Sequence, residues 1–191
     1  MLIADEVQTG LGRTCKRWAV EHWNVVPDIL TVAKSLGGGV MPISAVTTTE
    51  EIYQPMMYPN PFMHTTTTGG NALACSAAIA AIHVTLRERL WEQAAEKGMH
   101  LMGELDKFAV QYPQIYEKIT GKGLLIGMHF KNPEIGYKVA SGLFKRNILV
   151  AGTLTSAQTI RIEPPLIITN GQIDVLIDGL GETLKEISRS M

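Results

Sequence analysis

A lysine and a carboxylate stand at the ends of two short apolar runs in this chain of 191 residues. Lys34 follows the apolar run 29–33 and Asp5 follows the run 2–4. A lysine amine can form a Schiff base with an aldehyde cofactor once its ammonium loses a proton in a desolvated pocket. A carboxylate can keep the ring nitrogen of such a cofactor protonated, so that the ring becomes an electron sink. The two residues together point to amine chemistry on an aldehyde cofactor.

Each candidate residue taken alone has a plainer interpretation. A lysine after an apolar strand ordinarily opens a surface loop, and an Asp-Glu pair after a strand ordinarily begins a helix or lies in a solvated turn. Arg161, in a short strand before Pro164 and Pro165, is typical of a surface ion pair. Thr67 is one of four successive threonines, which agree equally well with simple β-strand propensity. The function therefore depends on whether these residues occur together in one pattern.

The first third of the chain alternates predicted strands and helices. Strands are expected at 2–4, 29–33 and 43–49, and a helical segment is expected at 16–22. This alternation is typical of a mostly parallel sheet that is covered by helices. Ligands of such sheets bind beyond the carboxyl ends of the strands, which is where the lysine and the carboxylate are expected to lie.

The middle of the chain is predicted to contain an irregular loop followed by two helices. The segment 55–64 contains three prolines and many apolar side chains, which predicts an irregular loop packed against a partner subunit or against the chain's own core. Helices are expected over 72–86 and from residue 90 to a point before Pro113. The later elements are expected as strand 118–130, helix 135–146, short strands 149–151 and 159–162, and a last helix with a capping box at Thr169 and Gln172.

Helices and mainly antiparallel strands from about Leu101 onward predict a separate small α+β domain. The composition, with 46% hydrophobic and 18% charged residues, is globular. A net charge of -1 gives no reason to expect a nucleic-acid partner, and no apolar run has the length of about 20 residues that spans a membrane. We therefore expect a cytoplasmic protein. Cys15 and Cys75 match no metal-ligand spacing, so no metal site is predicted.

The polar candidates fall into four motifs that occur in a fixed order. These are DEVQTG at 5–10, AKSLGGG at 33–39, HTTTTGGN at 64–71 and IRIEPPL at 160–166. Their order and spacing resemble the class III aminotransferases, which are pyridoxal-phosphate enzymes of fold type I, and the resemblance covers nearly the whole chain. Within that family the chain looks most similar to members that act on putrescine, through the segments GGGVMPISAV, NPEIGYKVAS and VAGTLTSAQTIRIEPPL.

This resemblance implies an α/β fold in two parts. Residues 1–100 correspond to the C-terminal part of the large, parallel-sheet domain that binds pyridoxal 5'-phosphate, together with a connecting helix. Residues 101–191 correspond to the small C-terminal α+β domain. Family members have a long N-terminal half that does not precede Met1 here, and the first predicted strand begins almost at Met1. We therefore expect this chain to be a fragment.

The resemblance also implies a role for each candidate residue in the first two motifs. Lys34 corresponds to the Schiff-base lysine, which also moves the proton between substrate and cofactor. Asp5 corresponds to the partner of the pyridinium nitrogen. Val7 corresponds to the residue that packs on the ring face, and Gln8 to the residue that approaches the phenolic oxygen.

Two further residues correspond to family positions that bind anionic groups. Thr67 corresponds to the threonine that binds the cofactor phosphate of the neighbouring subunit, which implies a homodimer. Arg161 corresponds to the arginine that binds a substrate carboxylate, here that of 2-oxoglutarate or glutamate.

The activity implied by the resemblance is transfer of an amino group from putrescine or a similar diamine to 2-oxoglutarate. Ornithine or acetylornithine aminotransferase activity is the alternative within the same class. A different alternative is a non-catalytic fragment that keeps part of the dimer surface, since half of a sheet leaves strand edges and apolar surface exposed. We expect the 191-residue chain by itself to be inactive.

Overall fold

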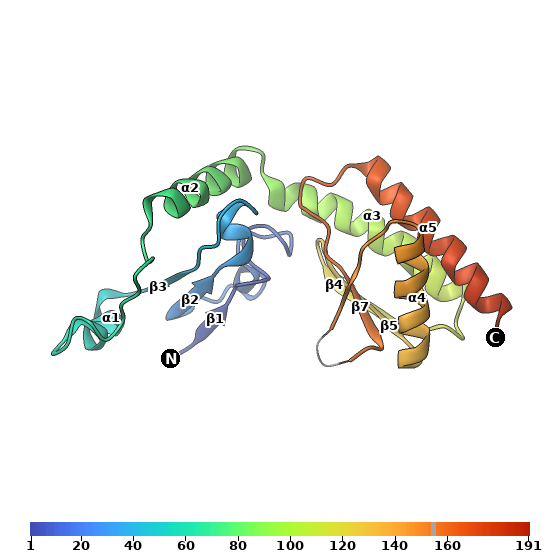
Figure 1. Ribbon diagram of the computed structural model, residues 1–191, viewed down its shortest axis with the longest axis horizontal. Coiled ribbons are helices and arrows are strands. Elements are labelled where there is room, and N and C mark those ends of the chain that lie inside the picture. Colours follow the sequence, from blue (N-terminus) through green and yellow to red (C-terminus); the bar gives the residue numbers. More distant parts are fainter. Residues whose placement is uncertain (154–155) are drawn as a thin grey trace. The chain divides into compact units, whose positions relative to one another are not determined.

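The computed structural model describes the whole chain except Leu154 and Thr155, which belong to one of the segments that carry the family resemblance. The described residues form two compact units, residues 1–91 (unit 1) and residues 92–191 (unit 2), as can be followed in Figure 1. The division falls within one helix, α3 (Leu90–Gln111), and the boundary expected from the sequence lies within the same helix.

Unit 1 contains a three-stranded sheet with the order β1-β2-β3. As predicted, β1 (Ile3–Asp5) and β2 (Ile29–Val32) are parallel. The expectation of a mostly parallel sheet is wrong for β3 (Ala45–Thr48), which is antiparallel to β2. The β2–β3 connection contains the 3-10 helix η2 (Lys34–Gly37) and a glycine turn, but no long crossover helix that could bring the chain back in parallel.

The helix predicted at 16–22 is shorter in the structure and begins later than expected. Only a 3-10 helix, η1 (Ala19–Trp23), is formed there. Cys15 and Asn24 bracket it, and both have a positive φ, at 64° and 52°. A left-handed residue cannot continue a right-handed helix, so the helical segment is confined between these two positions.

The predicted loop 55–64 begins later than expected, because its first residues belong to helix α1 (Glu50–Met57). The hydroxyl of Thr49 caps this helix by accepting a hydrogen bond from the amide of Ile52. Pro55 lies inside the helix, where it removes one backbone donor without ending it.

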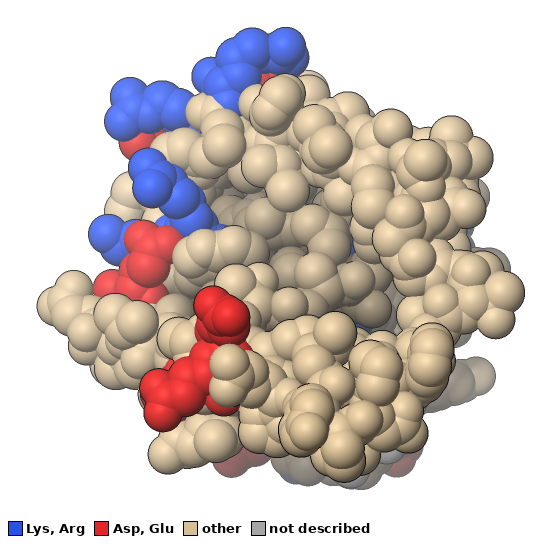
Figure 2. Space-filling model, turned by 90° about the vertical axis from the view of Figure 1, so that its left-hand side faces the viewer, with Lys and Arg blue, Asp and Glu red and all other residues tan. Residues whose placement is uncertain are grey.

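The loop that follows α1 does not pack on the core of its own unit. Tyr58 and Phe62 are 82% and 77% exposed, and Met63 is also exposed. Figure 2 views the molecule from the side on which α1 lies in Figure 1, and most of the surface seen there carries no charged side chain. The alternative in which this loop folds back onto its own core is therefore wrong for these residues.

The longer helices follow their local sequence signals. Helix α2 (Ala72–Arg87) begins after Asn71, whose side chain accepts hydrogen bonds from the amides of Leu73 and Ala74. Helix α3 ends at Gln111, before the proline at position 113. Among the helices that the structure describes, none has both the length and the apolar character needed to cross a membrane.

The sheet of unit 2 is antiparallel throughout its described strands, with the order β4-β5-β7-β6. The segment predicted as one strand over 118–130 is in fact a hairpin, which turns at Gly123 with a φ of 57°. The four strands are β4 (Tyr116–Lys122), β5 (Leu125–Phe130), β6 (Ala151–Gly152) and β7 (Thr159–Ile162).

Two helices of unit 2 share a continuous core with this sheet. Helix α4 (Pro133–Lys145) begins after Asn132, and helix α5 (Asn170–Arg189) begins with the capping box predicted at Thr169 and Gln172, which is confirmed. Alternate residues of β5 point into the core and are buried, as a strand with one covered face requires. The opposite face of the sheet, which carries the side chain of Arg161, remains more accessible.

Candidate active site

Asp5 and Lys34 lie at the same end of the sheet of unit 1, where strands β1 and β2 finish. Strands β1 and β2 are parallel, with Asp5 opposite Thr31, and Lys34 follows shortly after the end of β2. The amide of Glu6 donates to the carbonyl of Thr31 at 2.9 Å, which continues the pairing beyond β1. The structure therefore places the carboxylate and the lysine beyond the carboxyl ends of adjacent parallel strands, where ligands of such sheets bind.

Lys34 has an unusual backbone conformation for a residue with a side chain. Its φ is 46°, in the left-handed region, and it is the first residue of η2. Such a conformation costs on the order of 1 kcal/mol and is common at functional sites. The Nζ atom donates a hydrogen bond to Oε1 of Gln8 at 3.3 Å. The side chain is exposed in this chain, in contrast to the desolvated pocket expected from the sequence.

The residues between β1 and η1 are held by a buried carboxylate that the sequence analysis did not single out. Glu6 is 2% exposed, and its two carboxylate oxygens accept from the amide of Val20 at 2.9 Å and from the hydroxyl of Thr9 at 2.5 Å. Neighbouring side chains on a strand point to opposite sides, so one residue of an Asp-Glu pair faces inward. Asp5 is the exposed member, and its carboxylate accepts from the amide of Val7 at 3.1 Å.

A hollow of about 700 Å³ in unit 1 has Lys34 in its wall. Its other side includes the turn before α2, where Gly70 has a φ of 68° and no atom within 4 Å of the position that a Cβ would occupy. Open backbone of this kind can approach a phosphate closely. Thr66 and Thr68 line the hollow, whereas Thr67 does not and is exposed. The predicted role of Thr67 toward a neighbouring subunit stays a prediction.

The chemical groups gathered in unit 1 fit a phosphorylated aldehyde cofactor with a ring nitrogen. The set contains one amine at Lys34, one exposed carboxylate at Asp5, one amide at Gln8 and hydroxyl groups on a glycine-containing turn. An amine is needed for the aldehyde carbon, a carboxylate for the ring nitrogen, and hydroxyl and backbone groups for the phosphate. Unit 1 therefore carries groups of the kinds that pyridoxal phosphate needs, of which Lys34, Thr66 and Thr68 line the hollow.

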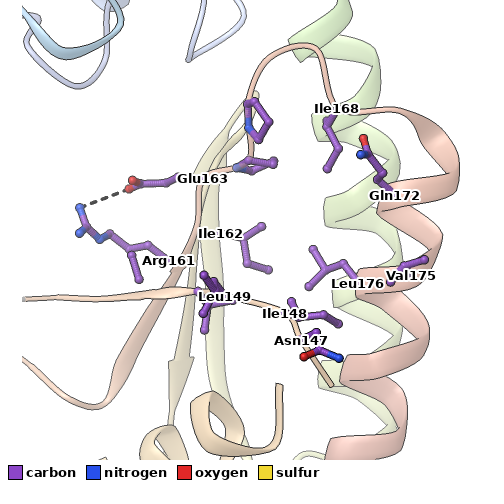
Figure 3. A pocket seen from close by; sticks show the side chains of 14 residues that line it. Asn147, Ile148, Leu149, Arg161, Ile162, Glu163, Ile168, Gln172, Val175 and Leu176 are labelled. Atoms are coloured by element: carbon purple, nitrogen blue, oxygen red, sulfur yellow. Dashed lines mark ion pairs between the residues drawn. The ribbon is translucent and has the colours of Figure 1, made fainter. Parts of the chain in front are cut away.

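Arg161 belongs to unit 2, where its guanidinium is held by neighbours in the same unit. Its Nε and Nη2 atoms donate to the carbonyl of Gly152 at 3.2 and 3.1 Å. Its Nη1 atom lies 3.2 Å from Oε1 of Glu163, an ion pair drawn in Figure 3. The plainer interpretation of Arg161, an ion-pair residue, is thus realised in the structure, and its role toward a substrate stays a prediction.

A second hollow, of about 520 Å³, lies beside Arg161 in unit 2. In Figure 3 the side chains of Arg161 and Glu163 extend from one side of β7, whereas Ile162 extends from the other side toward Leu176 of α5. This follows from the alternation of side chains along a strand. Glu163 was not among the predicted site residues, although its spacing of two residues from Arg161 was a usable signal.

Comparison with known proteins agrees with this geometry. Residues 1–184 match the family model described as aminotransferase class-III. The ornithine aminotransferase of Toxoplasma gondii ME49 is 32% identical with a TM-score of 0.90, and that of Plasmodium yoelii is 36% identical with a TM-score of 0.87. An acetylornithine aminotransferase from Elizabethkingia anophelis is 35% identical with a TM-score of 0.86.

These matches cover 97–100% of this chain but only 45–48% of the solved chains, so this chain spans less than half their length. Another structure of the Toxoplasma gondii enzyme contains pyridoxal phosphate at partial occupancy in its active site. The predicted fold class is confirmed, and the predicted cofactor is confirmed at the level of the family. With its model matched over 184 of 191 residues, this chain belongs to the class III aminotransferase family.

Proposed function

We propose that this protein takes part in pyridoxal-phosphate-dependent transfer of an amino group between an amine and a 2-oxo acid. The proposal depends on one observation, that Asp5 and Lys34 lie at the carboxyl ends of the parallel strands β1 and β2. The contact between Lys34 and Gln8 at 3.3 Å supports the proposal further, because the family resemblance gives the residue at position 8 a role beside the phenolic oxygen of the cofactor. Pyridoxal phosphate, when bound, supplies the electron sink for this chemistry.

Each residue of unit 1 has a separate task in this proposal. With pyridoxal phosphate bound, the Lys34 amine would hold the aldehyde carbon and would move a proton to and from the substrate carbon. The Asp5 carboxylate would keep the ring nitrogen of the cofactor protonated. The buried Glu6 fixes the segment that carries Val7 and Gln8. The hydroxyl groups of Thr66 and Thr68, in the turn before α2, would hold phosphate oxygens.

Ornithine or acetylornithine is the better supported amino donor. The solved structures that match this chain at 32–36% identity include two ornithine aminotransferases and one acetylornithine aminotransferase. Putrescine is the second candidate, and its support is the resemblance of the segments around Gly37–Val46 and Val150–Leu166 to members that act on it. In each case 2-oxoglutarate is the proposed amino acceptor.

We also propose that the complete enzyme is a homodimer. The support is the exposed apolar loop after α1, where Tyr58 and Phe62 are solvent-exposed within this chain. Such a surface ordinarily marks an interface. Sedimentation of the wild-type protein and of a Phe62→Ser variant tests this proposal. A dimer that is weakened by the substitution is expected, and a wild-type monomer at all concentrations would contradict it.

The activity is tested by adding pyridoxal phosphate to the protein and recording the visible absorption band of the lysine-bound cofactor. We expect the band in the wild type and in a control variant, Lys16→Ala, and its loss in Lys34→Ala. Lys16 is exposed on the same unit, so the control removes an equivalent amine from the surface. Bleaching of the band by ornithine, N-acetylornithine or putrescine then ranks the donors.

The outcomes of this test separate the two hypotheses. A band that survives Lys34→Ala would contradict the assignment of the lysine. A wild-type protein that shows no band would instead favour the non-catalytic alternative for this chain. A band that responds to none of the three donors would contradict the proposed substrates while leaving cofactor binding intact.

A further inference from the structure

Val7 and Gln8 lie within a tight turn that begins at Glu6. The backbone amide of Gly10 donates to the carbonyl of Glu6 at 3.0 Å, and the hydroxyl of Thr9 donates to the Glu6 carboxylate at 2.5 Å. The main chain and the side chain of Glu6 therefore both hold the residues that follow Gln8. Glu6 is 2% exposed, so water competes little for these hydrogen bonds.

The same carboxylate also closes a longer loop. Its second oxygen accepts from the amide of Val20 at 2.9 Å, 14 residues further along the chain. The backbone between Glu6 and Val20 is irregular, since Leu11, Gly12 and Cys15 have positive φ values of 55°, 98° and 64°. Left-handed conformations interrupt regular hydrogen bonding and cost energy for residues that carry a side chain. The Glu6 carboxylate therefore bonds to both ends of an irregular and strained loop.

The surroundings of Gly10 show that this turn is closely packed. A Cβ added to Gly10 would lie 2.8 Å from the carbonyl oxygen of Glu6 and 2.8 Å from a ring carbon of Trp18. Such close packing favours a single arrangement of the segment. In that arrangement Gln8 accepts a hydrogen bond from Nζ of Lys34 at 3.3 Å. The position of Gln8 relative to the amine therefore depends on the turn that Glu6 holds.

We propose that Glu6 is a positioning residue, which holds Gln8 against the Lys34 amine. Without the carboxylate the turn is released, and Gln8 is no longer kept within hydrogen-bond distance of Nζ. The amine then lacks a partner that it otherwise has to give up before it attacks an aldehyde carbon. The consequence for pyridoxal phosphate rests on the proposed function. The hold on the amine itself is a property of unit 1 and needs no cofactor.

The experiment measures how fast the Lys34 amine reacts with formaldehyde in the full 191-residue chain, in the absence of pyridoxal phosphate. A hydride reductant converts each adduct into a methylated lysine. Peptide mass spectrometry then counts the product at Lys34 and, as an internal reference, at the exposed Lys16. We expect Glu6→Ala to raise the rate at Lys34 about threefold, the factor that corresponds to one hydrogen bond. Lys16 is expected to react at its wild-type rate.

Further variants distinguish positioning from a general effect on the fold. Glu6→Gln keeps an oxygen for the Val20 amide and offers a donor to the Thr9 hydroxyl, so it is expected to restore the wild-type rate. Thr9→Val keeps the shape, removes the hydroxyl and is expected to raise the rate about twofold. Gln8→Ala is expected to raise it about threefold, with no further increase when Glu6→Ala is added. Glu51→Ala removes an exposed carboxylate on α1 and is expected to change nothing. Circular dichroism of each variant verifies that it is folded.

Several results would overturn the proposal. A wild-type rate at Lys34 in both Glu6→Ala and Thr9→Val would show that the carboxylate does not control the amine, and Thr9→Val alone decides if Glu6→Ala does not fold. A double variant that reacts faster than Gln8→Ala alone would show that Glu6 acts by another route. An equal rise at Lys16 would show that the whole loop has loosened. Failure of the proposed function appears separately, as a missing cofactor absorption band in the wild-type chain, and does not alter these rates.

Discussion

The two units of the chain differ in how much apolar surface they bury. Unit 2 has a continuous core that joins its sheet to α3, α4 and α5, with Leu101, Phe130 and Leu180 fully buried. The separate core cluster of unit 1 contains three buried residues, Val32, Leu36 and Ala78. Since burial of apolar area is the dominant favourable term in folding, unit 2 has much the larger source of stability.

The reactive groups are concentrated in the unit with the smaller core. The predicted lysine and its carboxylate partner are both in unit 1, and apolar strand residues of the same sheet, Ile3 and Val46, are exposed. An exposed apolar strand face is typical of a surface that another segment or subunit covers. The candidate reactive groups of this chain therefore lie in unit 1, whereas most of its intrinsic stability comes from unit 2.

The largest expected effect is that of Phe130→Ala. The ring is fully buried in unit 2 and lies 5.1 Å from the ring centroid of Tyr116. Removing it leaves a cavity and is expected to lower the free energy of unfolding of unit 2 by about 3–5 kcal/mol. Amide hydrogen exchange under native conditions, resolved by unit, measures the change.

The matched variant in unit 1 is Leu36→Ala, which truncates a member of the small cluster. We expect it to lower protection in unit 1 and to leave β5 unaffected. If either substitution lowered protection equally in both units, the units would unfold together and the comparison would be wrong.

A smaller effect is expected where two glycines of α3 differ in their surroundings. A Cβ added to Gly98 would lie 2.3 Å from the carbonyl oxygen of Gly123, whereas one added to Gly103 would have no neighbour within 4 Å. Gly98→Ala is therefore expected to destabilise unit 2 by about 1–3 kcal/mol. Gly103→Ala is expected to stabilise it by about 0.5–1 kcal/mol, because alanine restricts the unfolded chain.

Urea unfolding of both glycine variants checks this pair. Destabilisation by both substitutions to the same extent would mean that helix propensity and local space do not decide the outcome. Stabilisation by Gly98→Ala would show that α3 and the β4–β5 turn can separate without cost.

The helix caps allow a direct comparison of the two units. Asn71 caps α2 in unit 1 and Thr169 caps α5 in unit 2, and each accepts from backbone amides of its own helix. Asn71→Ala and Thr169→Ala are each expected to cost about 1 kcal/mol. Hydrogen exchange should assign each loss to its own unit. A loss in unit 2 caused by Asn71→Ala would contradict the separation of the units.

The smallest expected effect concerns acid stability of unit 2. The hydrogen bond from Arg146, at 2.6 Å, lowers the pKa of Glu186 from its usual value of 4.5. The unfolded state then binds more protons in acid, so this contribution is complete above the unfolded pKa and is lost as the pH falls through the folded pKa. Glu186→Gln is expected to flatten the fall of the melting temperature below about pH 5.

Thermal unfolding monitored over an acid pH series measures this effect. Glu96→Gln, an exposed glutamate on α3, serves as the control and is expected to leave the pH profile unchanged. If Glu186→Gln did not change the pH dependence of the melting temperature, the ion pair with Arg146 would contribute nothing to acid stability. Many exposed ion pairs make no measurable contribution.

Several elements were predictable because their signals are local. Asn71 before an alanine-rich stretch predicted the start of α2, and the Thr169 and Gln172 pattern predicted the capping box of α5. These interactions join residues within one helical turn, so nearby sequence contains all their partners. The parallel direction of β1 and β2 was also predicted, from the alternation of strands and helices.

Other features depended on distant partners and were not predictable in the same way. The antiparallel direction of β3 follows from a turn that lacks a crossover helix, and the segment predicted as one strand over 118–130 is a hairpin because Gly123 reverses the chain. Glu6 is buried because its carboxylate reaches the amide of Val20. A residue type alone does not reveal which long-range hydrogen bond it will make.

The sequence by itself determined the family of this chain and the order of its polar motifs, because residue types and spacing are preserved in the primary structure. It also determined that Lys34 and Asp5 each follow a short apolar strand. The tertiary structure alone decided that Lys34 contacts Gln8 and that Arg161 is paired with Glu163. Both contacts require the backbone to orient two side chains toward each other, which depends on strand pairing and turn geometry rather than on composition.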